Sequence, residues 1–144
     1  MAVFFFAAIV ILFSVFKLLK TRAIEDQKML DLANEMATKN SMTGVKNKRA
    51  YTVKETLINE SIGKGEIKPF AIVACDVNDL KYVNDNFDYE HGDKFIKDAC
   101  KTICETFTHS PIFRIGGDEF VAILEGQDYE EREKLVERLN HFFR

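Results

Sequence analysis

One stretch, IFRIGGDEFVAIL at residues 112–124, decides how this 144-residue chain is expected to fold. Two apolar runs, 112–115 and 120–124, flank the tetrapeptide Gly-Gly-Asp-Glu. Glycines between two apolar runs are typical of a β-hairpin, because its tight turn commonly needs positive φ angles. We therefore predict two paired strands, with Asp118 and Glu119 at the tip and positive φ in the glycines before them.

Helices and one further strand are predicted around this hairpin. The apolar run FAIVACDV, which follows Pro69, fits a buried strand at 70–75. Composition and apolar periodicity predict helices over 47–62, 79–87, 91–108 and 128–143. The inner face of the third of these helices is expected to carry Phe95, Ile96, Ala99, Ile103 and Phe107. This order of elements predicts an α/β domain with an antiparallel-containing sheet and flanking helices, not a doubly wound parallel sheet.

The N-terminal segment, residues 1–22, has the composition of a membrane anchor. Residues 2–16 carry no charge, and Lys17, Lys20 and Arg22 follow them. A spanning helix needs about 20 apolar residues, and this segment reaches the low end of that range. A signal peptide would place its positive charges first, and a buried helix is rarely apolar on all sides. We therefore expect a transmembrane helix, with the residues after it in the cytoplasm by the positive-inside rule.

Residues 23–39 are predicted to form a helical stalk, because they contain good helix formers and neither Gly nor Pro. Met29, Leu32 and Met36 recur at spacings of three and four residues, which makes a narrow apolar seam. Such a seam fits either a coiled coil between two copies or a helix lying against its own domain.

Composition excludes some classes of protein. The net charge of −3 argues against a nucleic-acid binder, which normally has a basic face. The three cysteines do not have the spacing of a disulfide framework. Cys100, Cys104 and His109 could form part of a zinc site, but buried thiols in a reducing compartment explain them more simply.

Three carboxylates are expected to meet at one edge of the sheet. Asp76 ends the strand at 70–75, while Asp118 and Glu119 occupy the hairpin tip. Two like charges ~4 Å apart repel by about 4 kcal/mol at an effective dielectric constant near 20, so such a site calls for a cation. Oxygen ligands favour Mg²⁺ or Mn²⁺, which would suit phosphoryl or nucleotidyl transfer. The alternative is a solvated hairpin tip without a ligand.

Three motifs in order resemble the GGDEF family, the diguanylate cyclases, over residues 36–144. Residues 116–120 read GGDEF, and residues 40–51, NSMTGVKNKRAY, resemble the family's opening DPLTGLxNRRAF. Residues 76–93, with DVNDLK, then Asn-Asp and Gly-Asp, resemble its DxDxFKxxND…GD block.

This resemblance implies a palm-like fold and the condensation of two GTP into cyclic di-GMP and two pyrophosphates. Each subunit of a homodimer would hold one GTP, and the 3′-hydroxyl of one would attack the α-phosphate of the other. The anchor would place this domain at the cytoplasmic face of a bacterial inner membrane. The alternative within the family is a catalytically inactive module that binds GTP for signalling.

The resemblance also implies roles for individual residues. Asp76, the Val77 carbonyl, Asp118 and Glu119 would hold two Mg²⁺ or Mn²⁺ ions, and Asp118 and Glu119 would be the catalytic carboxylates. By the same resemblance, Asn84 and Asp93 would bind guanine, and Lys81 would lie near the phosphates. Gly116 and Gly117 would lie beside the substrate, and Arg114 would brace the acidic cluster. The simpler alternatives for these residues are a surface amide, an N-cap at Asp93 and solvated cations.

The chain departs from the family at several positions. Asn40 and Asn78 stand where the family has Asp, and Asp88-Tyr89 replaces Gly-His. We expect Asp88 to tolerate a left-handed backbone, and we assign His91 no role. The RxxD motif of product inhibition is replaced by FTHS at 107–110, so feedback inhibition through that site is not expected.

The predicted organisation is an anchor at 1–22, a stalk at 23–39 and a GGDEF domain at 40–144. The family domain continues for some tens of residues past the end of this chain. We therefore expect this domain to lack a final strand and a Lys/Arg pair that contacts the triphosphate.

Overall fold

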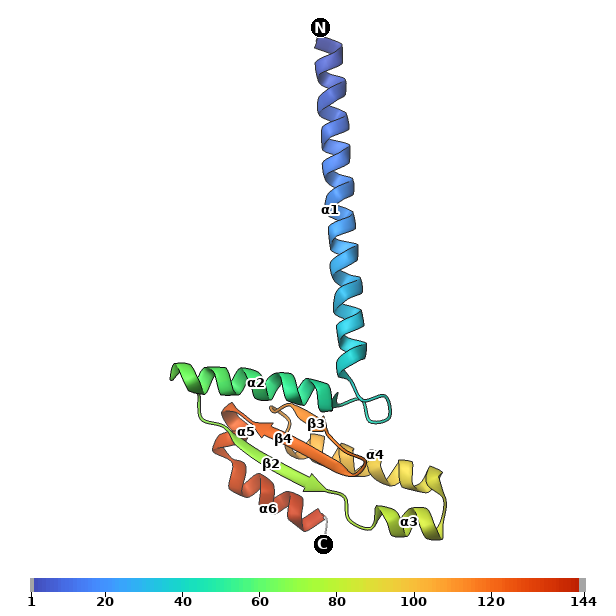
Figure 1. Ribbon diagram of the computed structural model, residues 1–144, viewed down its shortest axis with the longest axis vertical. Coiled ribbons are helices and arrows are strands. Elements are labelled where there is room, and N and C mark those ends of the chain that lie inside the picture. The colour runs from blue at the N-terminus through green and yellow to red at the C-terminus, as the bar shows by residue number, and fades with distance from the viewer. Residues whose placement is uncertain (1, 143–144) are drawn as a thin grey trace. The chain divides into compact units, whose positions relative to one another are not determined.

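A computed structural model describes the backbone of residues 2–142 and the side chains of residues 11–142 (Figure 1). The chain divides into two compact units, Met1–Ala37 and Thr38–Arg144. The first consists of helix α1 (Ala2–Thr38), which confirms the helix predicted over 23–39. Its seam residues Met29, Leu32 and Met36 are 65%, 50% and 74% exposed.

The predicted transmembrane helix stays a prediction. Among the described residues, no helix combines the length and the apolar character needed to cross a membrane. Residue 1 and the side chains of residues 2–10, which belong to the predicted span, lie outside the described part of the chain.

The second unit is a four-stranded sheet with helices on both faces (Figure 1). The strand order is β1-β3-β4-β2, with β1 parallel to β3 and the other neighbours antiparallel. This arrangement confirms an α/β domain with a mixed sheet. The strands are β1 (Lys46–Asn47), β2 (Ala71–Asp76), β3 (Ile112–Arg114) and β4 (Glu119–Leu124). The helices are α2 (Lys48–Lys64), α3 (Leu80–Asn86), α4 (Tyr89–Thr106), α5 (Gly126–Glu130) and α6 (Arg132–Phe142).

The alternation of side chains along β4 divides the core into two clusters. One cluster joins Phe120, Ala122 and Leu124 to apolar side chains of α4 and α6. The other joins Val121 and Ile123 to Phe113 and to residues of α2. As predicted, Ile96, Ala99 and Ile103 of α4 are buried together with Phe107, the residue that caps its C-terminus, and Phe95 is partly buried against them. Because β4 is buried on both faces, it holds the hairpin firmly.

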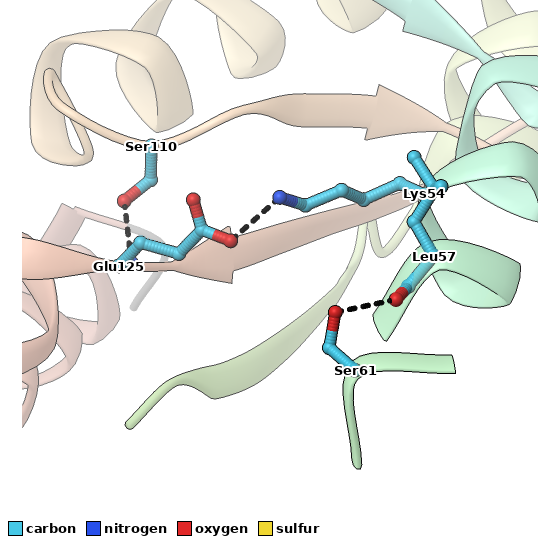
Figure 2. Close-up of polar contacts among 5 residues, drawn as sticks. All are labelled: Lys54, Leu57, Ser61, Ser110 and Glu125. Atoms are coloured by element: carbon cyan, nitrogen blue, oxygen red, sulfur yellow. Dashed lines mark hydrogen bonds and ion pairs between the residues drawn. The ribbon is translucent and has the colours of Figure 1, made fainter. Parts of the chain in front are cut away.

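Glu125 fixes the end of β4 that lies opposite the hairpin (Figure 2). Its carboxylate pairs with Lys54 Nζ of α2 at 2.6 Å, and its amide donates to Ser110 Oγ at 3.3 Å. On the same helix, Ser61 Oγ donates to the carbonyl of Leu57 at 3.0 Å. The two contacts of Glu125 tie α2 and the loop before β3 to the end of β4.

Several predicted boundaries were wrong. The last helix is divided at Glu131 into α5 and α6. Helix α4 begins earlier than expected because the Asp88 side chain accepts a hydrogen bond from the His91 amide and so acts as the N-cap. Asp88 is extended, with φ −172°, so the left-handed backbone expected there is absent. Asp79, before α3, is instead left-handed with φ 64°.

Candidate active site at the hairpin

Two of the predicted carboxylates face each other across neighbouring strands. The β2–β4 register pairs Asp76 with Glu119, and both residues are exposed. One residue further, the Val77 amide donates to the Asp118 carbonyl at 3.0 Å, which extends the ladder into the turn. Directly opposed residues of an antiparallel pair have Cβ atoms about 4.5–5.5 Å apart, and like charges there are destabilising. Among the described residues, no cationic side chain forms an ion pair with either carboxylate.

Gly116, the first glycine of the turn, is not there for the positive φ angle that we predicted. Neither Gly116 nor Gly117 has a positive φ; the glycines that do are Gly44, Gly65 and Gly126. A Cβ atom on Gly116 would instead collide with the Glu119 side chain, lying 3.1 Å from its Cδ and closer still to Oε2. Gly116 therefore gives the Glu119 carboxylate the space to fold back over the turn.

Arg114 braces the hairpin through backbone rather than through the carboxylates. Its Nε donates to the Gly117 carbonyl at 3.1 Å, and Nη2 donates to the same oxygen. Its Nη1 reaches Asn40 Oδ1 at 3.4 Å and Met42 Sδ at 3.0 Å. The guanidinium also lies 5.9 Å from the centre of the Phe120 ring. Arg114 thus joins the hairpin turn to the opening motif, more than 70 residues earlier in the chain.

The opening motif forms a compact loop around Asn40. Asn40 Oδ1 accepts hydrogen bonds from the amide and the hydroxyl of Thr43, at 3.1 and 2.9 Å. The Gly44 amide donates to the Asn40 carbonyl at 2.8 Å, and Gly44 has the positive φ of 74° that favours glycine. Asn40 keeps the acceptor role of the usual Asp but brings no charge to Arg114.

The predicted guanine-binding residues lie where α3 meets α4. Gly92 is buried under Asn84, and a Cβ atom there would lie 2.9 Å from Asn84 Cγ and closer to Oδ1. Asn84 Oδ1 is buried and has no hydrogen-bond partner among the described residues. Asp93 follows Gly92 directly and is exposed; it does not cap α4, since Asp88 does. Lys81, on α3, is also exposed.

The three expected carboxylates do not form one cluster. Within the described part of the chain, no group of three or more His, Cys, Asp or Glu side chains is placed to hold a metal ion. The structure pairs Asp76 with Glu119 across the two strands, and Val77 directly follows Asp76 in the chain. Two carboxylates and a carbonyl are hard oxygen donors that fit Mg²⁺, which keeps several waters and uses few protein ligands.

Two features of the domain, one near the hairpin and one at the opposite end of the sheet, carried no recognisable sequence signal. The left-handed backbone of Asp79 lies directly after the strand that carries Asp76. Asp128 is 2% exposed and accepts a hydrogen bond from the His109 amide at 2.9 Å, which holds the loop after α4.

A mixed sheet that opposes Asp76 of β2 to Glu119 of β4, with the buried, unpartnered amide oxygen of Asn84 on α3, defines an α/β domain with a polar site at the hairpin end of the sheet. The chain belongs to the GGDEF family: the family model described as "Diguanylate cyclase, GGDEF domain" matches residues 37–143.

Relatives by sequence are remote. The chain is 25% identical to "Cyclic di-GMP phosphodiesterase PdeR" of Escherichia coli, over 83% of this chain and 18% of that protein. It is 26% identical to "Probable diguanylate cyclase DgcT" of the same organism, over 76% of this chain and 24% of that protein. The chain therefore spans about a quarter or less of the length of these two relatives.

Solved structures confirm the fold. The coiled coil and GGDEF domain of DgcB from Caulobacter crescentus, in complex with c-di-GMP, aligns with a TM-score of 0.69 at 18% identity. That alignment covers 83% of this chain and 63% of the other. Diguanylate cyclase SiaD from Pseudomonas aeruginosa, in complex with its activator SiaC, aligns with a TM-score of 0.63 at 24% identity, over 88% and 51% of the two chains.

Proposed function

We propose that this chain is the GGDEF part of a longer diguanylate cyclase, which condenses two GTP into cyclic di-GMP and two pyrophosphates. Membership of the family and the intact signature at residues 116–120 support this proposal. The single observation that carries it is the opposition of Asp76 and Glu119 at the hairpin end of the sheet, where no cationic side chain of the described residues forms an ion pair with either of them.

Asp76, the Val77 carbonyl and Glu119 would hold Mg²⁺ or Mn²⁺, with Asp118 beside them as the second catalytic carboxylate. When bound, the ions would neutralise the triphosphate and lower the pKa of the attacking 3′-hydroxyl. The chain's own contribution is positional. Gly116 leaves space for the Glu119 carboxylate, and both glycines of the turn let the substrate approach closely.

Guanine selectivity would come from the junction of α3 and α4. Asp93 can accept hydrogen bonds from the N1–H and the N2 amine of guanine, neither of which adenine offers in that arrangement. Asn84 Oδ1 is buried without a partner, which costs about 1–3 kcal/mol. A ligand that reorients the Asn84 amide would recover part of that cost. Lys81 is exposed on α3 and would approach the phosphates.

Dimerisation and membrane attachment are part of the proposal. The reaction needs two GTP molecules facing each other, so two copies must associate. The seam of Met29, Leu32 and Met36 is exposed along α1 and offers a surface for a coiled coil. The uncharged residues 2–16, followed by basic residues, support anchoring in a bacterial inner membrane with the GGDEF domain in the cytoplasm.

The test uses the longest natural reading frame that contains this chain, incubated with GTP and Mg²⁺. We expect cyclic di-GMP from the wild type and at least a hundredfold less from Asp76→Asn and Glu119→Gln. Glu60→Gln is the matched control, because it removes an exposed carboxylate of α2 and should leave the rate unchanged. A folded, dimeric wild type that makes no product would refute the cyclase proposal.

A second candidate is a GGDEF module that binds GTP without turning it over. The departures from the family pattern at Asn40, Asn78 and Asp88-Tyr89 favour it. Its signature in the same experiment is Mg²⁺-dependent GTP binding, lost in Asp76→Asn, with no cyclic di-GMP formed by any variant.

A further inference from the structure

The junction of α3 and α4 contains a pair of side chains to which the proposed reaction gives no role. Asp88 lies between the two helices, and His91 lies in the first turn of α4. Asp88 Oδ1 accepts a hydrogen bond from the His91 amide at 2.8 Å, and it lies 2.8 Å from Nδ1 of the same histidine. One carboxylate oxygen therefore contacts both the backbone and the ring of His91.

The same pair is connected to the predicted guanine-binding residues. The Asp88 carbonyl accepts a hydrogen bond from the Gly92 amide at 3.2 Å, as the carbonyl of an N-cap residue does at the start of a helix. Gly92 lies directly under Asn84 of α3, whose buried Oδ1 has no hydrogen-bond partner among the described residues. Asp93 is the next residue of the chain. Asp88 therefore fixes the turn of α4 that carries Asp93 and supports Asn84.

The surroundings of the His91 ring are open to solvent. Its centre lies 5.7 Å from that of the Phe87 ring, with the two planes inclined by 36°. Among the described residues, His91 forms an ion pair with Asp88 alone, and both side chains are more than half exposed. The other ionisable residues of α3 and of the first two turns of α4 are all exposed as well: Lys81, Tyr82, Asp85, Tyr89, Glu90, Asp93 and Lys94.

The contact between Asp88 and His91 should depend on pH. The hydrogen bonds from the His91 amide and ring lower the pKa of Asp88, so this side chain stays a carboxylate in neutral and mildly acidic solution. Histidine is the side chain that changes its charge between pH 5 and 8 in ordinary surroundings. A protonated His91 would donate to Asp88 with a full positive charge, and charge-assisted hydrogen bonds are the stronger ones. The cap on α4 is therefore expected to tighten as the pH falls.

We propose that Asp88 and His91 are positioning residues for guanine recognition, in which the Asp88 cap holds the α4 turn that carries Asp93. Because Gly92 lies under Asn84, loosening this turn would displace both of the predicted guanine contacts. Since guanine is assigned to Asn84 and Asp93 only in the proposed function, this inference rests on it. A tighter cap should favour GTP over ATP, because the two nucleotides carry the same triphosphate and differ in the base.

The experiment measures binding of GTP and of ATP to the full chain with Mg²⁺ by equilibrium dialysis, at about pH 5.5 and about pH 8. The ratio of the two affinities cancels the titration of the phosphates. We expect this ratio to be about twofold higher at the lower pH in the wild type, the effect of one exposed ion pair. Asp88→Ala should lower it about fivefold at both pH values, the usual effect of a lost N-cap. Asp88→Asn keeps the cap without the charge, so it should match the wild type at pH 8 and lose the pH dependence, as should His91→Gln.

Asp98→Ala is the matched control, because it removes an exposed carboxylate about two turns further along α4 and should behave like the wild type. Amide exchange followed by NMR separates a lost cap from a general loss of structure: in Asp88→Ala, the His91 and Gly92 amides should exchange faster while those of the sheet do not. An unchanged ratio in Asp88→Ala would overturn the proposal, as would a pH dependence that survives in Asp88→Asn. A wild type that does not bind GTP would instead overturn the guanine site of the proposed function, and this inference with it.

Discussion

Removing one charge from the opposed carboxylates should stabilise the domain in the absence of divalent cations. Asp76 and Glu119 are register partners at the end of the β2–β4 ladder. Asp76→Asn and Glu119→Gln keep the size and shape of each side chain while removing its charge. Most substitutions destabilise a protein, so a gain in stability from either substitution would indicate that the two carboxylates repel each other.

The expected gain can be bounded with Coulomb's law. At a separation of about 5 Å, two unit charges repel by about 3 kcal/mol at an effective dielectric constant of 20, and by about 0.8 kcal/mol in bulk water. Both side chains are exposed, so the value in water is the better guide. We expect each single variant to gain about 1 kcal/mol. The double variant should gain little more, because the repulsion is already gone after the first change.

Urea unfolding followed by tyrosine fluorescence suits this measurement. The four tyrosines, Tyr51, Tyr82, Tyr89 and Tyr129, all lie in the second unit, so α1 does not contribute to the signal. A gain of about 1 kcal/mol corresponds to a midpoint shift of roughly 0.5 M urea. The buffer should contain EDTA and a fixed ionic strength, because salt screens the repulsion.

When Mg²⁺ is added, the wild type should become more stable than the two amide variants. At ten times its dissociation constant, a cation that binds only the folded state adds about 1.4 kcal/mol to the wild type. Asp76→Asn and Glu119→Gln should gain much less, and Glu60→Gln should respond like the wild type. The reasoning is refuted if both amide variants are less stable than the wild type in EDTA, because the opposed carboxylates would then not repel each other.

Three further predictions concern the contacts around the site. Asn40→Asp should raise stability by about 0.5–1 kcal/mol in urea unfolding, because a charged acceptor would strengthen the bond from Arg114. Gly92→Ala should lower GTP affinity at least tenfold in equilibrium dialysis, because its methyl group would displace Asn84. A misfolded variant would be recognised by a changed tyrosine fluorescence signal. Asp128→Ala should cost about 1–3 kcal/mol, measured by urea unfolding, since it removes a buried side chain that accepts a hydrogen bond from the His109 amide.

Elements with strong local patterns were predictable from the sequence. The hairpin, the strand after Pro69 and the amphipathic helix α4 are each encoded by periodic apolar residues within a short stretch. Strand β1 was not predictable, because its two residues show no pattern and it exists only by pairing with β3. The start of α4 was missed because the Asp88 N-cap lies before the periodic part of the helix.

The pairing of Asp76 with Glu119 was predictable from the sequence, whereas other parts of the candidate site's geometry were not. The roles assigned to the site residues stay predictions. Ordered motifs were enough to select Asp76 and Glu119, and a simple strand pairing brings them together. The role of Gly116 could not be predicted, because local turn rules concern φ angles, whereas this glycine is needed to accommodate the Glu119 side chain. Side-chain contacts of that kind follow from packing between residues and not from the preference of one.

Arg114 shows why motifs far apart in the sequence belong to one structural unit. Its guanidinium contacts the turn carbonyl of Gly117, the amide oxygen of Asn40 and the sulfur of Met42. A single cation thus joins the signature to the opening loop, and a neutral Asn40 makes that link weaker than the charged pair implied by the family pattern. A weaker link lowers the free energy needed to separate loop and hairpin. A perturbation of the opening loop therefore needs less free energy in this chain before it alters the turn that carries Glu119.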